Sequence, residues 1–259
     1  MFEEFPNSLA LVFVGAFGLI VGSFLNVCIY RLPRRESLVL PASHCPACGR
    51  SLRWFENVPV VSYVVLRGRC RTCGVRISPV YPLIELAAAV VALVWYVQFG
   101  LSLLFLSRLV FACALLVLFM IDLRQRVLPN TITLPGILVG FAFSTVTLPG
   151  WRDSLLGAVV GGAGLFLLAE AYYRLRHEEG MGMGDVKMLA MIGAFLGWKL
   201  MLLTLMLSSV VGALVGVALI VARKGDMKYA LPFGTFLALA ALFATVAGDP
   251  IVKWYLGLY

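Results

Sequence analysis

Four of the six cysteines stand in two short motifs that suit a metal ion. Both motifs are Cys-x-x-Cys pairs followed by glycine: Cys45 and Cys48 in "HCPACGR", and Cys70 and Cys73 in "GRCRTCG". This pattern is typical of four-cysteine zinc ribbons, in which thiolates surround Zn²⁺ tetrahedrally. Two disulfides are the alternative, which a reducing compartment disfavours. Because four thiolates leave no position for water, we expect the Zn²⁺ to be structural.

Two aspartates stand at the ends of apolar segments. Asp122 follows the segment 102–121 in "FMIDLRQRVLPN", and Asp185 precedes the segment 186–197 in "GMGDVKM". Asp185 has a structural interpretation as a helix N-cap, whereas Asp122 stands at a helix C-terminus, where the dipole disfavours a carboxylate. Environments that favour charge on one carboxylate and disfavour it on the other suit an aspartyl dyad. Such a dyad activates water with one group and protonates the leaving amine with the other.

Small residues and one lysine surround Asp185. Gly180, Gly182 and Gly184 precede it or adjoin it, and Lys187 follows. Because glycine has no Cβ, these positions let a substrate backbone approach the carboxylate closely. We therefore assign Gly182, Gly184 and Lys187 to a candidate active-site loop.

The elements that must position these residues are membrane helices. The 259-residue chain is 61% hydrophobic, with a mean hydropathy of +0.97. Segments of about 17 to 25 apolar residues can cross a bilayer as helices, whose backbone hydrogen bonds close internally. The sequence thus predicts an all-α, polytopic transmembrane bundle with a small cytoplasmic zinc-ribbon-like domain. Its eight candidate spans are 8–30, 82–99, 102–121, 131–148, 154–173, 186–197, 199–222 and 231–247. Only Gly197-Trp198-Lys199 separates the sixth from the seventh, so a count of seven stays open.

The net charge of +8 follows from topology. Lys and Arg concentrate on alternate connections, with nine arginines between Arg31 and Arg76. The positive-inside rule then places the N-terminus outside and every basic connection in the cytoplasm. A nucleic-acid partner is not needed to explain the charge. We predict three parts: a first transmembrane helix at 1–30, a cytoplasmic zinc-binding domain at 31–81 and a membrane domain at 82–259.

The chain resembles the bacterial type IV prepilin peptidases, membrane aspartic proteases of the Gly-x-Gly-Asp kind. The two cysteine motifs and five further blocks carry the resemblance: "GSFLNVCIYRLP" (22–33), "RISPVYPLIEL" (76–86), "DLRQRVLPNTITLP" (122–135), "GMGMGDVKMLAMIGAFLGW" (180–198) and "LPFGTFLALA" (231–240). The resemblance implies that Asp122 and Asp185 are the catalytic pair. Two positions depart from the family pattern: Asn130 stands where Asp is frequent, and Thr235 where Pro is frequent.

The resemblance also implies substrates and a second activity. The substrates would be type IV prepilins or type II secretion pseudopilins, cleaved after a basic leader peptide at the bacterial inner membrane. Bacterial members also methylate the new N-terminus with S-adenosylmethionine, an activity associated with the zinc-bearing loop. We select Glu85 as the candidate carboxylate for that step; a solvated or Arg76-paired side chain is the alternative.

Two other functions remain open from the sequence. One is a non-enzymatic assembly or transport protein that docks a partner through its zinc domain. A transporter would more naturally hold ionisable groups near the bilayer midplane, whereas both aspartates lie at a membrane border. The other is a protease that cuts within transmembrane helices, for which the scissile bond would lie deeper.

Overall fold

The computed structural model describes most of the chain: residues 7–178, 182–222 and 231–257. Gly180, which precedes the candidate active-site loop, and the connection 223–230 between the last two predicted spans lie outside these ranges.

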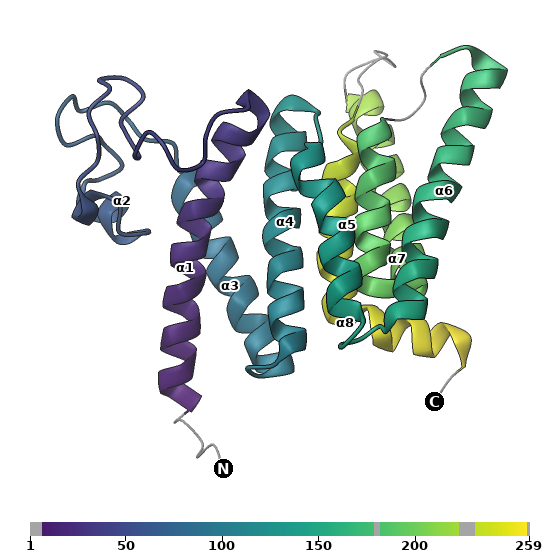
Figure 1. Cartoon of the computed structure of the whole chain (residues 1–259). Coiled ribbons are helices and arrows are strands. Elements are labelled where there is room, and N and C mark those ends of the chain that lie inside the picture. The colour runs from purple at the N-terminus through teal and green to yellow at the C-terminus, as the bar shows by residue number, and fades with distance from the viewer. Residues whose placement is uncertain (1–6, 179–181, 223–230, 258–259) are drawn as a thin grey trace. The chain divides into compact units, whose positions relative to one another are not determined.

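Helices make up the regular structure (Figure 1). In chain order they are α1 (Asn7–Arg31), η1 (Leu32–Arg34), η2 (Trp54–Glu56), α2 (Val61–Val65), α3 (Val80–Phe99), α4 (Leu103–Gln125), α5 (Asn130–Ser144), α6 (Trp151–Arg176), α7 (Met183–Ala222) and α8 (Phe233–Leu256), where η marks 3₁₀ helices. Within the described ranges the β-type pairing is limited to two isolated bridges. The predicted all-α fold is confirmed.

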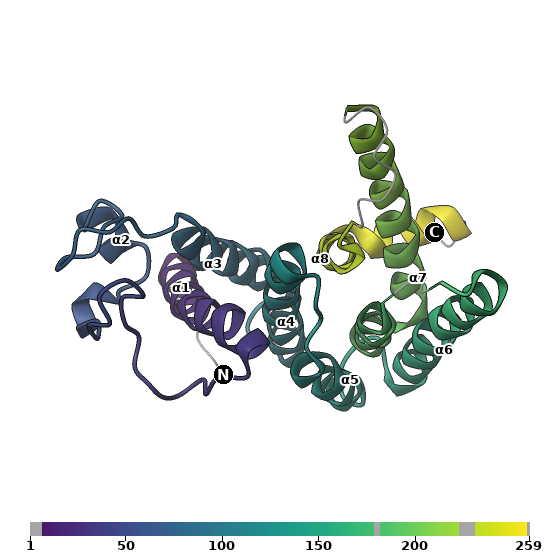
Figure 2. The same ribbon diagram turned by 90° about the horizontal axis from the view of Figure 1, so that it is seen from above.

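In the part of the chain that the structure describes, six helices are long and apolar enough to cross a membrane: α1, α3, α4, α6, α7 and α8. The multi-pass prediction is thereby confirmed. α5 has 15 residues, so it is about 22 Å long and shorter than the roughly 30 Å of hydrocarbon. α7 runs over 40 residues but breaks at Gly197, whose φ of 78° and ψ of 173° are not helical. Figure 2 shows that α7 changes direction along its length. This break is where the sixth and seventh predicted spans meet.

The chain divides into two compact units, Met1–Phe105 and Leu106–Tyr259. In the first unit α1 packs along α3, and two glycines of α1 allow the close approach. A Cβ added at Gly22 would lie 2.5 Å from the Cα of Glu85, and one at Gly18 would lie 2.6 Å from the Cα of Ala89. The start of α3 is therefore fixed against α1 at Glu85.

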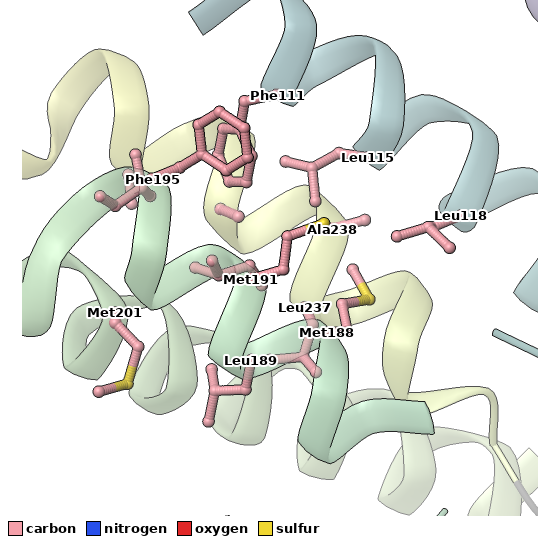
Figure 3. Close-up of a cluster of buried hydrophobic side chains, with 14 of the residues drawn as sticks. Phe111, Leu115, Leu118, Met188, Leu189, Met191, Phe195, Met201, Leu237 and Ala238 are labelled. Atoms are coloured by element: carbon pink, nitrogen blue, oxygen red, sulfur yellow. The ribbon is translucent and has the colours of Figure 1, made fainter. Parts of the chain in front are cut away.

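The core of the second unit lies between α4, α7 and α8 (Figure 3). Its fully enclosed side chains include Phe111, Leu115, Leu118, Met188, Leu189, Met191, Phe195, Met201, Leu237 and Ala238. Three helices from distant parts of the sequence thus share one dry apolar cluster. That cluster fixes the ends of these helices relative to one another.

The break in α7 leaves carbonyl groups that the helix itself cannot satisfy. The carbonyl of Ala194 accepts hydrogen bonds from the hydroxyls of Ser144 (2.9 Å) and Ser154 (2.7 Å). The guanidinium of Arg108, only 6% exposed, donates to the carbonyl of Phe195. Because unsatisfied backbone groups are costly in an apolar medium, these three side chains make the break tolerable.

Candidate functional site

Asp122 lies near the C-terminal end of α4 and is 5% exposed. Its Oδ2 accepts a hydrogen bond of 2.8 Å from the backbone N–H of Thr235, in the first turn of α8. An N-cap side chain commonly accepts this type of bond, but here the carboxylate comes from another helix. The positive end of the α8 dipole therefore offsets the unfavourable C-terminal end of α4.

The turn before α8 is shaped around the Asp122 carboxylate. A Cβ at Gly234 would lie 2.9 Å from Asp122 Oδ2, so this position has room only for glycine. The Thr235 hydroxyl donates to the carbonyl of Pro232 (2.6 Å), which closes the turn. The block "LPFGT" is thus a cradle for one carboxylate oxygen.

Asp185 is the third residue of α7, which begins at Met183. Its own N–H donates to the carbonyl of Gly182 (3.1 Å), so it lies within the first helical turn rather than at the N-cap. Its side chain is part-buried, and the Asp122 carboxylate lies near enough to act on it electrostatically. The structure therefore brings the two predicted catalytic residues together within the second unit.

Leu128 packs against both Gly184, which precedes Asp185, and Gly234, which lies beside the Asp122 carboxylate. A Cβ at Gly184 would lie 2.8 Å from the Cβ of Leu128, and one at Gly234 would lie 3.0 Å from its Cδ1. Gly184 is therefore required for packing against Leu128. Gly182 is different, because it is exposed and its nearest neighbour is Asp185 Oδ2. Of the two predicted glycines, Gly182 is the one that leaves space beside the carboxylate.

The apolar cluster begins one helical turn from each aspartate. Leu118 is four residues before Asp122, and Met188 is three residues after Asp185, so each lies on the same helix face as its aspartate. Both Leu118 and Met188 are fully buried (Figure 3). The dyad thus lies at the margin of a dry core and at the helix ends.

Lys187 contacts Asn130, one of the two positions that depart from the family pattern. Its Nζ donates a 3.0 Å hydrogen bond to the side-chain oxygen of Asn130, at the start of α5. The contact joins α7 to α5 beside the dyad. Asn130 therefore has a structural partner and needs no catalytic role.

The four motif cysteines converge in the first unit. Their sulfur atoms all lie within 4.8 Å of one another, and the Sγ atoms of Cys45 and Cys73 are 3.8 Å apart. Sulfurs about 2.3 Å from a tetrahedral zinc ion are about 3.8 Å from each other. No disulfide joins the four motif cysteines. The arrangement fits a tetrahedral metal and gives no support to two disulfides.

The two cysteine motifs have the same local geometry. The N–H of Cys45 donates to the carbonyl of Arg50, and the N–H of Cys70 donates to that of Val75, both at 2.9 Å. The glycine after each motif has a φ of 69°. Backbone N–H groups of Cys73 and Thr72 lower the pKa of Cys70 to about 6, which favours the thiolate that a metal binds.

Glu56 and Arg50 brace the first motif. Arg50 Nη2 donates to both carboxylate oxygens of Glu56, at 2.8 and 2.9 Å, and the N–H of Arg53 adds a third bond at 2.8 Å. The guanidinium of Arg50, followed by the Arg53 N–H, lowers the pKa of Glu56. Glu56 is therefore a structural carboxylate whose charge is already balanced.

Glu85 is buried, at 8% exposure, in the early turns of α3. Its Oε2 accepts a 2.7 Å hydrogen bond from the backbone N–H of Val60, in the cysteine loop. Neither a solvated side chain nor a pair with Arg76 is therefore correct.

Sequence reasoning missed three contributors to these sites. The N–H of Thr235 and the space at Gly234 hold Asp122, and Leu128 separates the two aspartate segments. Thr235 and Gly234 belong to a quoted block but lie more than 100 residues from Asp122, so local spacing gave no signal. The one signal at position 235 was that threonine stands where proline is frequent in the family that the chain resembles.

Two family models match the chain. The bacterial peptidase A24 N-terminal domain matches residues 16–99, and the type IV leader peptidase family matches residues 109–217. The first range contains the four cysteines and Glu85, and the second contains both aspartates.

Relatives with curated names match over most of their length. A prepilin leader peptidase/N-methyltransferase of Pseudomonas putida is 43% identical over 260 residues, covering 90% of this chain and 89% of the relative. Proteins of the same name from Stutzerimonas stutzeri and Aeromonas salmonicida are each 38% identical, covering 96% and 95% of this chain and 95% and 93% of the relatives. No solved structure matches the chain.

Proposed function

Because the chain belongs to the type IV leader peptidase family, we propose that it is a membrane aspartic endopeptidase that removes leader peptides from prepilins or pseudopilins and then methylates the new N-terminal residue. The names of the relatives supply both activities, and the proximity of Asp122 and Asp185 in this chain supports the first. No observation favours a non-enzymatic transport or assembly role.

The peptidase proposal rests on the proximity of Asp122 and Asp185. They come from α4 and α7 and lie near enough to interact electrostatically, and Asp185 lies beside the exposed Gly182. Two carboxylates that share a site hold one proton between them. Such a pair contains a base and an acid at once, which peptide hydrolysis requires.

Each residue then has a part in the reaction. The ionised carboxylate takes a proton from water, whose oxygen attacks the scissile carbonyl carbon. The protonated carboxyl group donates its proton, so that the C–N bond breaks and a neutral amine leaves. Thr235 N–H keeps Asp122 Oδ2 in place, which leaves Oδ1 to face the reacting atoms. The missing side chain at Gly182 gives the substrate backbone access.

The test is substitution of each aspartate by asparagine, which preserves shape but removes the acid–base function. We expect Asp122→Asn and Asp185→Asn to cleave a prepilin at least about 100-fold more slowly, because general acid–base catalysis contributes about 10²–10⁴-fold. Mass spectrometry of both products gives the rate and the cleavage position.

Glu170→Gln is the matched control. Glu170 pairs with Arg174 on the exposed surface of α6 at 2.7 Å, an interaction of little energetic weight. This variant should cleave at the wild-type rate. Near-wild-type cleavage by either aspartate variant would contradict the dyad assignment. A cut inside the apolar segment of the substrate would instead indicate an intramembrane protease.

A structural Zn²⁺ at Cys45, Cys48, Cys70 and Cys73 is part of the proposal. The sulfur positions support it, since their spacing suits a tetrahedral ion. All four ligand positions would be thiolates, so the ion would stabilise the loop and take no part in hydrolysis. The second activity would take its methyl group from S-adenosylmethionine.

We place the protein in the bacterial inner membrane, with its N-terminus outside and the cysteine loop in the cytoplasm. The arginines between Arg31 and Arg76 support this orientation. A single cysteine added to a cysteine-free variant tests it. In intact spheroplasts an impermeant maleimide should label position 3 and leave position 39 unlabelled; the reverse pattern would overturn the orientation.

A further inference from the structure

The short helix α2 has an apolar face that no part of the described chain covers. Val61, Val64 and Val65 stand at positions i, i+3 and i+4, which share one helix face, and they are 56%, 67% and 72% exposed. Ser62 and Tyr63, on the other side of the helix, line a cavity of the first unit. A patch of exposed large apolar side chains outside the transmembrane helices indicates a contact surface.

α2 lies beside the first turns of α3 rather than beyond the ends of the transmembrane helices. The N–H of Val60, the residue before α2, donates a 2.7 Å hydrogen bond to Glu85, the sixth residue of α3. The hydroxyl of Tyr63 donates to the carbonyl of Ile77 (3.3 Å), in the segment that leads into α3. Figure 1 shows α2 below the level at which α1 ends.

This level corresponds to the boundary between lipid headgroups and acyl chains. α3 has 20 residues, so it is about 30 Å long and just spans the hydrocarbon. Its first turns therefore lie near one border of the hydrocarbon. Amphipathic helices bury their apolar face about 5–10 Å into this zone. The helix η2, which precedes α2, exposes Trp54, a residue type that is enriched there.

The start of α2 is held by a strained residue. Val60 is the N-cap of α2 and has a φ of 59°, an unfavourable conformation for a β-branched side chain. Its N–H nevertheless reaches the Glu85 carboxylate, and Gly22 lets the α1 backbone lie against the Cα of Glu85. Such strain persists only where the surrounding structure maintains it. α2 is therefore tied to both transmembrane helices of the first unit.

The loop that carries α2 is basic. Between positions 31 and 81 there are nine arginines and two glutamates. One of these glutamates, Glu56, is already bound by Arg50. Most of the arginines are exposed, among them Arg34, Arg35, Arg53 and Arg67. Clusters of about four to eight basic residues next to a transmembrane helix are attracted to anionic lipid headgroups.

We propose that the cysteine loop docks on the surface of an anionic phospholipid bilayer. The valine face of α2 enters the acyl-chain boundary of the leaflet at which α1 ends, and the exposed arginines bind the anionic headgroups. The proposal rests on the transmembrane helices of the first unit and on neither enzymatic activity, so its failure would leave the proposed function untouched.

A tryptophan on the valine face reports which medium surrounds it. The full-length Val65→Trp protein is placed in nanodiscs that hold one copy each and consist of phosphatidylcholine and phosphatidylglycerol. The wild-type protein, with its five tryptophans, supplies the emission to subtract. Lipids brominated near the headgroup end of the acyl chain quench a tryptophan in the boundary zone, whereas iodide quenches one in water.

We expect the added emission of Val65→Trp to lose most of its intensity in brominated lipid and to resist iodide. Emission that iodide quenches and brominated lipid does not would place the valine face in water and overturn the docking. Emission that neither quencher reaches would show that the face is covered by protein, which also overturns it.

Two double variants, each made in the Val65→Trp protein, test the valine face itself. Val61→Asp with Val64→Asp puts two charges on the face, which are costly among acyl chains, and should replace quenching by lipid with quenching by iodide. Val61→Leu with Val64→Leu keeps the face apolar and should leave quenching by lipid as it was. Zinc content equal to that of the parent shows that the loop is intact. Unchanged quenching by lipid in the Asp pair would overturn the role of the valines, and the Val65→Trp result decides the docking without this pair.

The lipid charge tests the role of the arginines. Nanodiscs of phosphatidylcholine alone lack anionic headgroups, so we expect brominated lipid to quench the Val65→Trp emission less and iodide to quench it more. Equal quenching in charged and neutral nanodiscs would overturn the part that the proposal assigns to the arginines.

Discussion

The cysteine loop and the helical core around the aspartates are stabilised by different interactions. In the loop the buried apolar groups are few: Val39, Leu40 and Trp54 are 81%, 71% and 83% exposed, while Cys45 and Cys70 are buried. In the second unit, α4, α7 and α8 enclose a cluster of fully buried Leu, Met and Phe side chains (Figure 3). The loop therefore depends on its sulfurs and backbone turns, and the core depends on packing.

The two regions also hold their acidic groups differently. A helix N-terminus supplies the hydrogen bond to Asp122, and a strained loop residue supplies the one to Glu85. A helix end that is packed into a core persists without a ligand, whereas a loop held by a metal persists only while the metal is bound. Mutations in the two regions should therefore have separable effects on the two activities.

The largest effect is expected from loss of the metal. Cys70→Ser removes one of four thiolates, and structural zinc contributes about 10–16 kcal/mol to the folding of small domains. We expect zinc to fall from one ion per chain to near zero, and trypsin to cut at the arginines of the loop. Methyl transfer should disappear, while cleavage of prepilin by the dyad persists. Elemental analysis, limited proteolysis and the two assays measure these outcomes.

Cys28→Ala is the control for the cysteine experiment. Cys28 is 7% exposed in α1 and lies outside both motifs, where it acts as a small apolar side chain. This variant should keep its zinc and both activities. A Cys70→Ser protein that retains one zinc ion and a protease-resistant loop would show that the loop does not depend on the metal.

A smaller effect is expected in the second unit, at the break in α7. Arg108→Met removes the donor to the Phe195 carbonyl and keeps an apolar stem like the one that carries the guanidinium. A buried acceptor left without a partner costs about 1–3 kcal/mol. We expect a loss of that size in the free energy of unfolding, measured by denaturant titration in micelles, with zinc content unchanged. Arg108→Lys keeps a cationic donor and should recover part of the lost free energy of unfolding. A Met variant as stable as wild type would show that the hydrogen bond from Arg108 to the Phe195 carbonyl does not stabilise the break in α7.

The sequence predicted the elements of both regions well, because each rests on a local pattern. Apolar segments of membrane-spanning length gave the helices, and Gly197-Trp198-Lys199 marked the break that the structure has at Gly197. The paired Cys-x-x-Cys motifs gave the sulfur cluster in the same way. The pairing of Asp122 with Asp185 followed from an argument about helix ends and the resemblance, and their proximity agrees with it.

Contacts between distant segments could not be predicted in this way. Nothing near Asp122 in the sequence indicates that Thr235, at the start of another helix, donates to it. A solvated or Arg76-paired side chain was the alternative for Glu85, because the sequence does not reveal that Val60 takes up a strained conformation and donates its N–H to this carboxylate. Residue spacing predicts which side chains share a face of a helix. Hydrogen-bond donors such as Thr235 and Val60 are brought to their carboxylates by packing across a whole unit, which spacing does not reveal.

The smallest effect is expected at Thr235, whose N–H at the N-terminus of α8 holds the carboxylate of Asp122. Thr235→Pro removes the N–H that donates to Asp122 Oδ2. Proline is tolerated in the first turn of a helix, and the backbone bond that this N–H makes there is a long one, 3.3 Å to the carbonyl of Pro232, so α8 should remain folded. A hydrogen bond to a charged group contributes about 1.5–3 kcal/mol, and the lower figure corresponds to about a tenfold loss in kcat. Thr235→Ala keeps the N–H and should cleave prepilin at close to the wild-type rate. If the Pro and Ala variants lose activity equally, the Thr235 hydroxyl holds the turn, and the N–H has no special role in positioning Asp122.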